Sequence, residues 1–209
     1  MGDSQSAEPC RRPYELGRRQ EASDRRRDAV LTAAREQLER SGLSDVTMDS
    51  LAKAAGVTRQ TIHNLFGTRS ALLEALFDRL AADAGMGRMR EVFAAPDGDT
   101  ALVRMVEVFT QFWSGQRMIL KKIRAIAALE PDFGAAVKAR DARRQGIAAR
   151  VVERLSARGP EMDEEERGRK IACLVALTSF EFFDAMAESC GDQEKAAEWL
   201  GGLVRKAVL

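Results

Sequence analysis

The chain has 209 residues, 45% of them hydrophobic and 31% charged, which is enough for one large or two small domains around a buried core. Lysine and arginine number 33 against 32 aspartates and glutamates, and the net charge of +1 excludes a wholly basic protein that coats nucleic acid, but not a local basic module. The single histidine argues against a multi-histidine metal centre, and the three cysteines argue against a disulfide framework. No run of roughly 20 apolar residues indicates a membrane partner. Together these features favour a reducing, cytoplasmic setting without a cofactor.

The N-terminal residues 1–23 predict a flexible basic tail, because they combine proline, glycine and serine with clustered arginines. The arginines crowd into residues 11–27. Either they are simply solvated, or they form an arm that touches phosphates, and the sequence leaves both interpretations open.

From residue 24 onward the sequence predicts an all-α protein. The five prolines leave long stretches rich in good helix formers, and no stretch alternates apolar and polar residues as a half-buried strand would. Glycines near residues 85–87 are expected to bend or end the fourth helix. The predicted helices cover about residues 24–41, 47–55, 58–66, 70–93, 99–114, 116–129, 132–157, 163–189 and 192–208.

Residues 47–66 have the pattern of a helix-turn-helix. Thr47 and Thr58 are suitable caps for two short helices, and Gly56 supplies the turn between them. The second helix of such a motif enters the DNA major groove with its N-terminal residues at the base edges. On this helix Ile62, Leu65 and Phe66 are expected to face inward.

The outward face of the second helix carries only side chains that can hydrogen-bond to DNA. Arginine suits guanine, and glutamine or asparagine suits adenine. No carboxylate lies on this face, which fits a surface that meets phosphates. The outward residues are Arg59, Gln60, Thr61, His63 and Asn64.

From Asp24 to Leu80 the sequence resembles the TetR (tetracycline repressor) family of transcriptional regulators. The resemblance rests on Ala33-Ala34 in the first helix, Gly42 after it, Thr47, the run Ala55-Gly56-Val57-Thr58, and Phe66 followed by Arg69. It departs from the family pattern at Leu38, where phenylalanine is frequent, and at His63, where tyrosine is usual. The resemblance implies an N-terminal DNA-binding domain over residues 24–84 and a helical-bundle domain for ligand binding and dimerisation over residues 85–209.

The resemblance also assigns roles within the motif. It makes Thr47, Thr58, His63 and Arg69 phosphate contacts, although His63 is equally open to interpretation as a plain surface residue. The candidates for base readout are Arg59, Gln60, Thr61 and Asn64, because phosphate contacts position a protein and base contacts specify its site.

The C-terminal part has no motif of its own. Aromatic residues and methionines gather in the fourth to sixth predicted helices, either as ordinary core packing or as an adaptable apolar pocket. The ligand-pocket candidates are Met86, Met89, Phe93, Met105, Phe109, Phe112, Trp113 and Met118. The two last helices carry apolar residues in excess, which we expect either to form a dimer interface, as the family implies, or to fill the bundle core. The dimer-interface candidates are Leu174, Phe180, Phe183, Leu200 and Leu203.

The sequence thus predicts a homodimeric regulator, a repressor released from a palindromic operator in double-stranded DNA by a small apolar effector of unknown identity. One alternative is a regulator controlled by a protein partner or by no ligand. Another is an all-α enzyme, which is less favoured because the sequence lacks a Glu-x-x-His pair, a glycine-rich phosphate loop and a nucleophile paired with a base.

Overall fold

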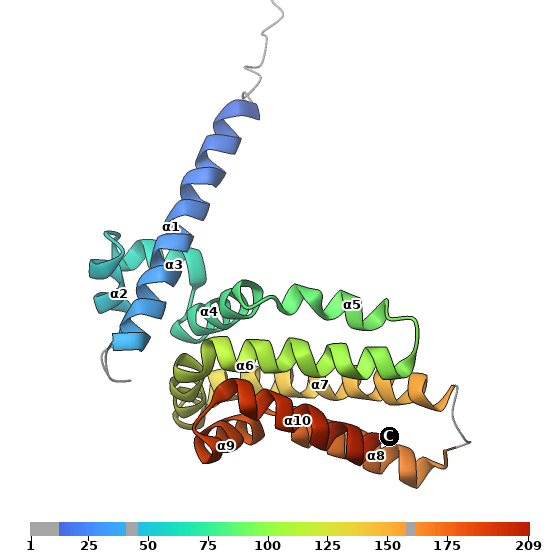
Figure 1. The fold of residues 1–209 in the computed structure, drawn as a ribbon. Coiled ribbons are helices and arrows are strands. Elements are labelled where there is room, and N and C mark those ends of the chain that lie inside the picture. The colour runs from blue at the N-terminus through green and yellow to red at the C-terminus, as the bar shows by residue number, and fades with distance from the viewer. Residues whose placement is uncertain (1–12, 41–45, 158–161) are drawn as a thin grey trace, which may run out of the picture. The chain divides into compact units, whose positions relative to one another are not determined.

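The structure, a computed structural model, describes residues 13–40, 46–157 and 162–209, and every regular element in these ranges is a helix (Figure 1). The all-α prediction is confirmed. The chain divides into two compact units, residues 1–72 and residues 73–209. Among the described residues, no helix combines the length and the apolar character needed to cross a membrane.

The first unit is built from three helices, α1 (Pro13–Arg40), α2 (Met48–Ala54) and α3 (Arg59–Phe66). Each contributes one apolar face to a common core, where the side chains are almost fully covered. The core includes Val30, Ala34, Leu38, Val46, Leu51 and Ile62. Gly42, which was expected to end the first helix, lies outside the described residues.

The predicted flexible tail is wrong for its second half, because α1 begins at Pro13 rather than near Asp24. Proline is tolerated in the first turn of a helix, and the residues that follow are mostly good helix formers that continue the helix without a break. The sequence interpretation gave too much weight to Gly17, whose cost within a helix is only about 1 kcal/mol. Residues 1–12 lie outside the described residues.

The second unit contains the remaining helices. They are α4 (Arg69–Asp83), which starts in the first unit, the 3-10 helix η2 (Met86–Arg88), α5 (Met89–Phe93), α6 (Gly98–Leu129), α7 (Pro131–Ser156), α8 (Glu164–Leu177), α9 (Phe180–Cys190) and α10 (Gln193–Val208). The long helices α6 and α7 fold back on each other, and α10 packs beside α8, α9 and α6 (Figure 1). Helix α6 is the centre of this unit, since its side chains are buried along most of its length.

Two predicted helix boundaries in this unit are wrong. The expected break near Gly115 does not occur, because buried apolar residues on both sides keep α6 continuous and one interior glycine costs little. Conversely, the helix predicted over residues 163–189 is divided at Thr178 and Ser179. The Ser179 hydroxyl accepts a hydrogen bond from the backbone N–H of Phe182 at 3.1 Å and so begins a new helix.

The two units divide between Leu72 and Leu73, inside α4, whereas the resemblance places the domain boundary after residue 84. The second half of α4 belongs with the bundle because its side chains contact α6 and α7. The Phe77 ring meets the Phe112 ring edge-on at 5.8 Å, and Arg140 forms ion pairs with Glu74 and Asp78.

A substitution at Gly98 tests the contact between α6 and α7. A Cβ at this position would lie 2.6 Å from the backbone nitrogen of Leu155, so Gly98→Ala forces the two helices apart and should destabilise the protein by about 1–3 kcal/mol. The control is Gly115→Ala in the same helix, where nothing lies within 4 Å and the change should stabilise the helix by roughly 0.5–1 kcal/mol. Thermal unfolding followed by circular dichroism measures both, and equal melting temperatures for the two variants would contradict the contact.

Candidate nucleic-acid interface and ligand cavity

Two short helices joined by a tight turn occupy residues 48–66. The Thr47 hydroxyl accepts the backbone N–H of Ser50 at 3.1 Å, and the Ser50 hydroxyl accepts that of Thr47 at 2.9 Å, so a reciprocal capping box begins α2. The Thr58 hydroxyl accepts the backbone N–H of Thr61 at 3.1 Å and begins α3. Gly56 between the helices has a φ of +65°, a conformation that side-chain-bearing residues rarely adopt.

The inner face of α3 fixes the helix against the rest of the first unit. Ile62 and Phe66 are buried, as predicted, while Leu65 is half-buried. Arg27 of α1 lies over the Phe66 ring at 4.6 Å and donates a hydrogen bond to the Leu65 carbonyl at 3.2 Å. A cation at the last turn of α3 satisfies an end carbonyl and suits the helix dipole. This arginine of the N-terminal cluster is therefore part of the fold.

The outer face of α3 gathers the predicted DNA-contacting side chains. Arg59, Gln60, His63 and Asn64 are exposed and Thr61 is half-buried. Two internal hydrogen bonds order this surface. The Gln60 amide donates to the Asn64 side-chain oxygen at 2.9 Å, and the Thr58 and Thr61 hydroxyls are 2.9 Å apart.

An acidic residue that the sequence interpretation overlooked lies beside this face. Asp49 of α2 forms an ion pair with Arg59 at 3.0 Å, and both side chains are 69% exposed. The surface around α3 therefore carries a carboxylate, although α3 itself has none. The spacing of ten residues across a turn gives no periodic signal, so only the folded motif brings the two together. An exposed pair of this kind contributes little to stability and can exchange for another partner.

Arg69 is placed differently from an arginine that only contacts phosphate. Its Nε donates a hydrogen bond to the Val46 carbonyl at 3.1 Å, and partial burial lowers the pKa of Arg69. Arg69 thus holds the segment before α2 against the start of α4. Thr47 and Thr58 are exposed at the N-termini of α2 and α3, where backbone N–H groups and the helix dipole favour an anion.

The second unit contains a cavity of about 230 Å³ between α4, η2, α6 and α7. Its aromatic wall is a set of contacting rings, in which Phe109 stacks on Trp113 at 5.9 Å and Phe112 lies 4.7 Å from Trp113. The lining also includes Phe77, Asp78, Ala81, Met86, Arg140, Asp141, Arg143, Arg144 and Ile147.

The structure brings four of the eight pocket candidates together in this cavity, namely Met86, Phe109, Phe112 and Trp113. The other four are not among its lining residues, which corrects the prediction. Met105 is fully buried in the core one turn before Phe109 along α6, whereas Met118 is 67% exposed. Phe93 is 40% exposed under the guanidinium of Arg150, and Met89 is half-buried in α5.

Sequence reasoning missed the arginines of α7 that line the same cavity. Arg140 is anchored to α4 through Asp78 at 2.8 Å, and its guanidinium lies over the Phe77 ring at 5.1 Å. Arg144 is buried, and burial lowers its pKa, with the nearby charges contributing less. The spacing along α7 does carry a signal for Arg144, because it stands seven residues after Val137 and four before Ala148, on the buried face of the helix.

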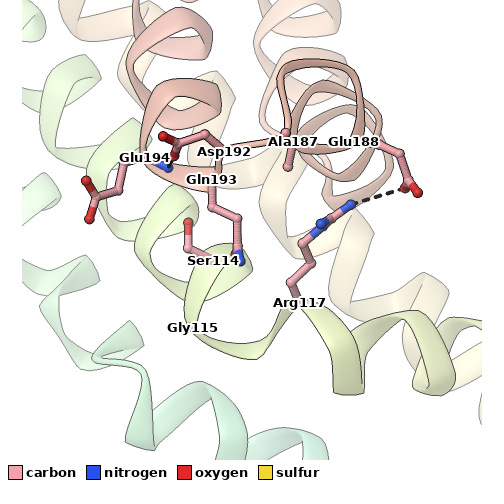
Figure 2. A pocket seen from close by; sticks show the side chains of 9 residues that line it. Ser114, Gly115, Arg117, Ala187, Glu188, Asp192, Gln193 and Glu194 are labelled. Carbon is pink, nitrogen blue, oxygen red and sulfur yellow. Dashed lines mark hydrogen bonds and ion pairs between the residues drawn. The ribbon is translucent and has the colours of Figure 1, made fainter.

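A larger hollow of about 740 Å³ lies where α6 faces the junction of α9 and α10. Figure 2 shows that polar and charged side chains line it, with Arg117 reaching across to Glu188. Three of its four charged lining residues have partners within the chain. Arg117 contacts Asp184 at 2.6 Å and Glu188 at 3.1 Å, and Asp192 caps α10. Polar and charged groups line most of this hollow, so it suits a small apolar ligand less well than the aromatic cavity does.

The dimer-interface candidates are corrected by their burial within a single chain. The side chains of Leu174, Phe180, Phe183 and Leu200 are at most 3% exposed, because α8, α9 and α10 pack them against α6 and one another. A side chain that its own chain covers cannot meet a second copy. Only Leu203, at 42% exposure, remains available. Trp199, one turn earlier on the last helix, α10, is 49% exposed.

The geometry of α2, the Gly56 turn and α3 defines a helix-turn-helix, which is carried here by an all-α chain with a separate helical bundle. Comparison with known proteins agrees. Residues 30–76 match the family model for bacterial regulatory proteins of the tetR family. Over these residues the chain is similar to the TetR family, in the region where its sequence predicts the resemblance.

Individual relatives are distant. The HTH-type transcriptional regulator EthR of Mycolicibacterium smegmatis is 31% identical over 143 residues, and the match covers 55% of this chain and 65% of that protein, just under two thirds. A TetR transcription regulator of Haloarcula marismortui superposes with a TM-score of 0.70 at 16% identity, covering 88% of this chain and 96% of the other. A regulator of Saccharomonospora viridis in complex with choline superposes with a TM-score of 0.65 at 17% identity, covering 86% and 95%. These two structures share the fold.

The cap of α3 gives a direct test of the motif. Thr58→Ala removes the acceptor for the Thr61 N–H and should destabilise the first unit by about 1 kcal/mol. Thr58→Ser keeps a hydroxyl and should restore most of this stability. Urea unfolding followed by circular dichroism measures the difference, and an alanine variant as stable as the parent chain would show that α3 does not depend on this cap.

Proposed function

We propose that the protein is a sequence-specific DNA-binding transcriptional regulator, a homodimeric repressor that a small effector releases from a palindromic operator. The observation that carries the proposal is the exposed face of α3, where Arg59, Gln60, His63 and Asn64 stand on a helix held by its caps and its buried face. The match of residues 30–76 to the tetR family model supports it. Bacterial DNA lies in the cytoplasm, where such a regulator would act.

DNA binding is assigned to the first unit and effector binding and dimerisation to the second. In the first unit, base readout falls to Arg59, Gln60, Thr61 and Asn64 on the outer side of α3. Phosphate contact falls to Thr47, Thr58, His63 and Arg69. Arg69 combines this with its bond to the Val46 carbonyl, so that a phosphate contact would be held rigidly to the motif.

A second copy of the chain is proposed to cover the outer faces of α8 and α10, which lie side by side. On α8 the small residues Gly168, Ala172 and Ala176 recur every four residues on the exposed side. On α10 the exposed side chains of Trp199 and Leu203 are also four residues apart. Small residues let two helices approach closely, and the exposed tryptophan and leucine supply apolar area. This surface replaces the buried residues that the sequence suggested.

Effector binding is assigned to the aromatic cavity of the second unit. Its wall combines apolar surface with a few charged groups, as ligand sites usually do. The similar structure from Saccharomonospora viridis is in complex with choline, which supports the assignment of a small-molecule site to this fold. A ligand there would touch Phe77 on α4, the helix that begins at Arg69, and could thereby change the affinity for DNA.

Selection from a random library of DNA duplexes with the purified full chain tests the proposal. We expect enrichment of a palindrome whose half-sites are about one helical turn apart or a multiple of it. Binding should weaken steeply with salt, because phosphate contacts release counterions. Recovery of no sequence motif, together with salt-independent binding, would reject a DNA-binding function.

Arg59→Ala should relax sequence preference, costing about 1–3 kcal/mol on the selected duplex if Arg59 reads guanine. Binding to a scrambled duplex should change much less. Fluorescence anisotropy on both duplexes measures the effect. Asp49→Asn removes the ion-pair partner of Arg59 and should strengthen binding to both duplexes, while Arg79→Ala, on α4 in the second unit, is the control. If Arg59→Ala lowers the affinity for both duplexes equally, Arg59 contacts phosphate only and does not read a base.

Leu203→Glu should give monomers with weak affinity for the palindrome, because it places a charge in the proposed apolar contact between two copies. The control is Leu129→Glu, at an exposed leucine that ends α6 away from α8 and α10, which should remain dimeric. Size-exclusion chromatography with light scattering decides between them. A Leu203→Glu dimer that still binds DNA would place the interface elsewhere.

A further inference from the structure

Arg144 is the buried charged residue of the cavity lining. Only 7% of the residue is exposed, and among the described residues its Nε has no hydrogen-bond partner. Its Nη1 donates to the Thr178 carbonyl at 3.3 Å, which is a long bond. Its nearest carboxylate, Asp141, is 3.9 Å from Nη2. A guanidinium buried with so few partners is costly unless something else completes its contacts.

The carboxylates around Arg144 are already engaged by other arginines. Both oxygens of Asp141 accept hydrogen bonds from Arg124, at 2.7 and 3.0 Å, so Asp141 offers Arg144 only a distant charge. Asp78, on the other wall, pairs with Arg140 at 2.8 Å. The cavity lining therefore holds three arginines against two aspartates. Arg140 has a close carboxylate and Arg143 is exposed to solvent, whereas Arg144 is buried without a close counter-ion.

We propose that the effector is a small carboxylic acid with an aromatic or short aliphatic body, whose carboxylate pairs with Arg144 while the body lies against Phe109, Phe112 and Trp113. This inference rests on the proposed effector control and names the ligand class of that site. A planar guanidinium is suited to carboxylate oxygens, and a charge-assisted hydrogen bond in a buried setting is roughly twice as strong as a neutral one.

The aromatic wall alone would also suit a cation, because ring faces attract ammonium groups. The charged residues of the cavity lining argue against a cationic ligand. A cation would lie beside a buried Arg144 and would have to take an aspartate away from an arginine that already holds it. An anion needs no such exchange, since Arg144 is buried and its Nε is unused. A cationic ligand is thus the outcome that contradicts the inference.

The size of the cavity limits the ligand. Its volume of about 230 Å³ is below the range of about 300–1,000 Å³ typical of pockets for drug-sized molecules. An acid with a single ring or a short chain fits this space, whereas a fused multi-ring compound does not. Benzoate, phenylacetate and hexanoate are therefore suitable probes.

The experiment measures binding of matched probes to the full chain by calorimetry and by the fluorescence of Trp113. Trp199→Phe removes the only other tryptophan, which lies exposed on α10. Benzoate is compared with benzyl alcohol and benzylamine, which present a similar ring with a neutral or a positive head. Arg144→Met keeps the apolar stem of the side chain and removes the charge, and Arg117→Met makes the same change in the larger hollow of Figure 2.

We expect benzoate or phenylacetate to bind most tightly, and Arg144→Met to weaken that binding by about 10- to 100-fold, as for loss of a hydrogen bond to a charged group. Benzyl alcohol binding should be unchanged in Arg144→Met, which shows that the cavity is intact, and Arg117→Met should bind benzoate normally. Equal loss of acid and alcohol binding would reduce Arg144 to a structural residue and overturn the inference.

Further outcomes separate this inference from effector control itself. If benzylamine or benzyl alcohol binds and releases the selected DNA duplex while no acid does, effector control stands and the carboxylate inference fails. If no probe binds while the chain still binds the duplex, both the cavity assignment and the carboxylate inference are wrong, and DNA binding is unaffected.

Discussion

A single buried carbonyl connects the parts of the second unit. The Thr178 carbonyl, at the end of α8, accepts a hydrogen bond from the Trp113 indole at 3.1 Å and another from Arg144 at 3.3 Å. Thr178 is only 1% exposed. The carbonyl thereby joins α6 and α7 to the α8–α9 junction. Because a buried carbonyl must be paired, this contact fixes the aromatic wall and the buried arginine of the cavity together.

The helix-turn-helix of the first unit could be predicted almost completely because its signals are local. Thr47 and Thr58 each form a cap within three residues, and Gly56 adopts the positive φ that the turn needs. The inward position of Ile62 follows from helical periodicity over a few turns. What escaped prediction here is the pair of Asp49 and Arg59, since a contact across a turn depends on the folded angle between two helices and not on spacing along either one.

The second unit was predicted less well because its features come from residues far apart in the sequence. The aromatic residues of α6 were recognised, but the arginine that faces them stands in α7, and its carbonyl partner lies 34 residues further on. Apolar residues on α8 and α9 were assigned to a dimer interface because composition alone cannot distinguish a core face from an exposed one. Burial separates them. Phe183 is inside the chain, and Trp199 is on its surface.

The charges of the cavity also suggest how a ligand would act on α4. Arg140 lines the cavity and at the same time holds α4 through Glu74, Asp78 and the Phe77 ring. A ligand can shift a conformational equilibrium only if it interacts differently with two states. An anion beside Arg144 would attract Arg140 as well and so compete with the carboxylates of α4. The conformation in which α4 keeps these ion pairs and the conformation in which it loses them would then bind the anion with different affinities. Such a difference is what effector control of DNA binding requires.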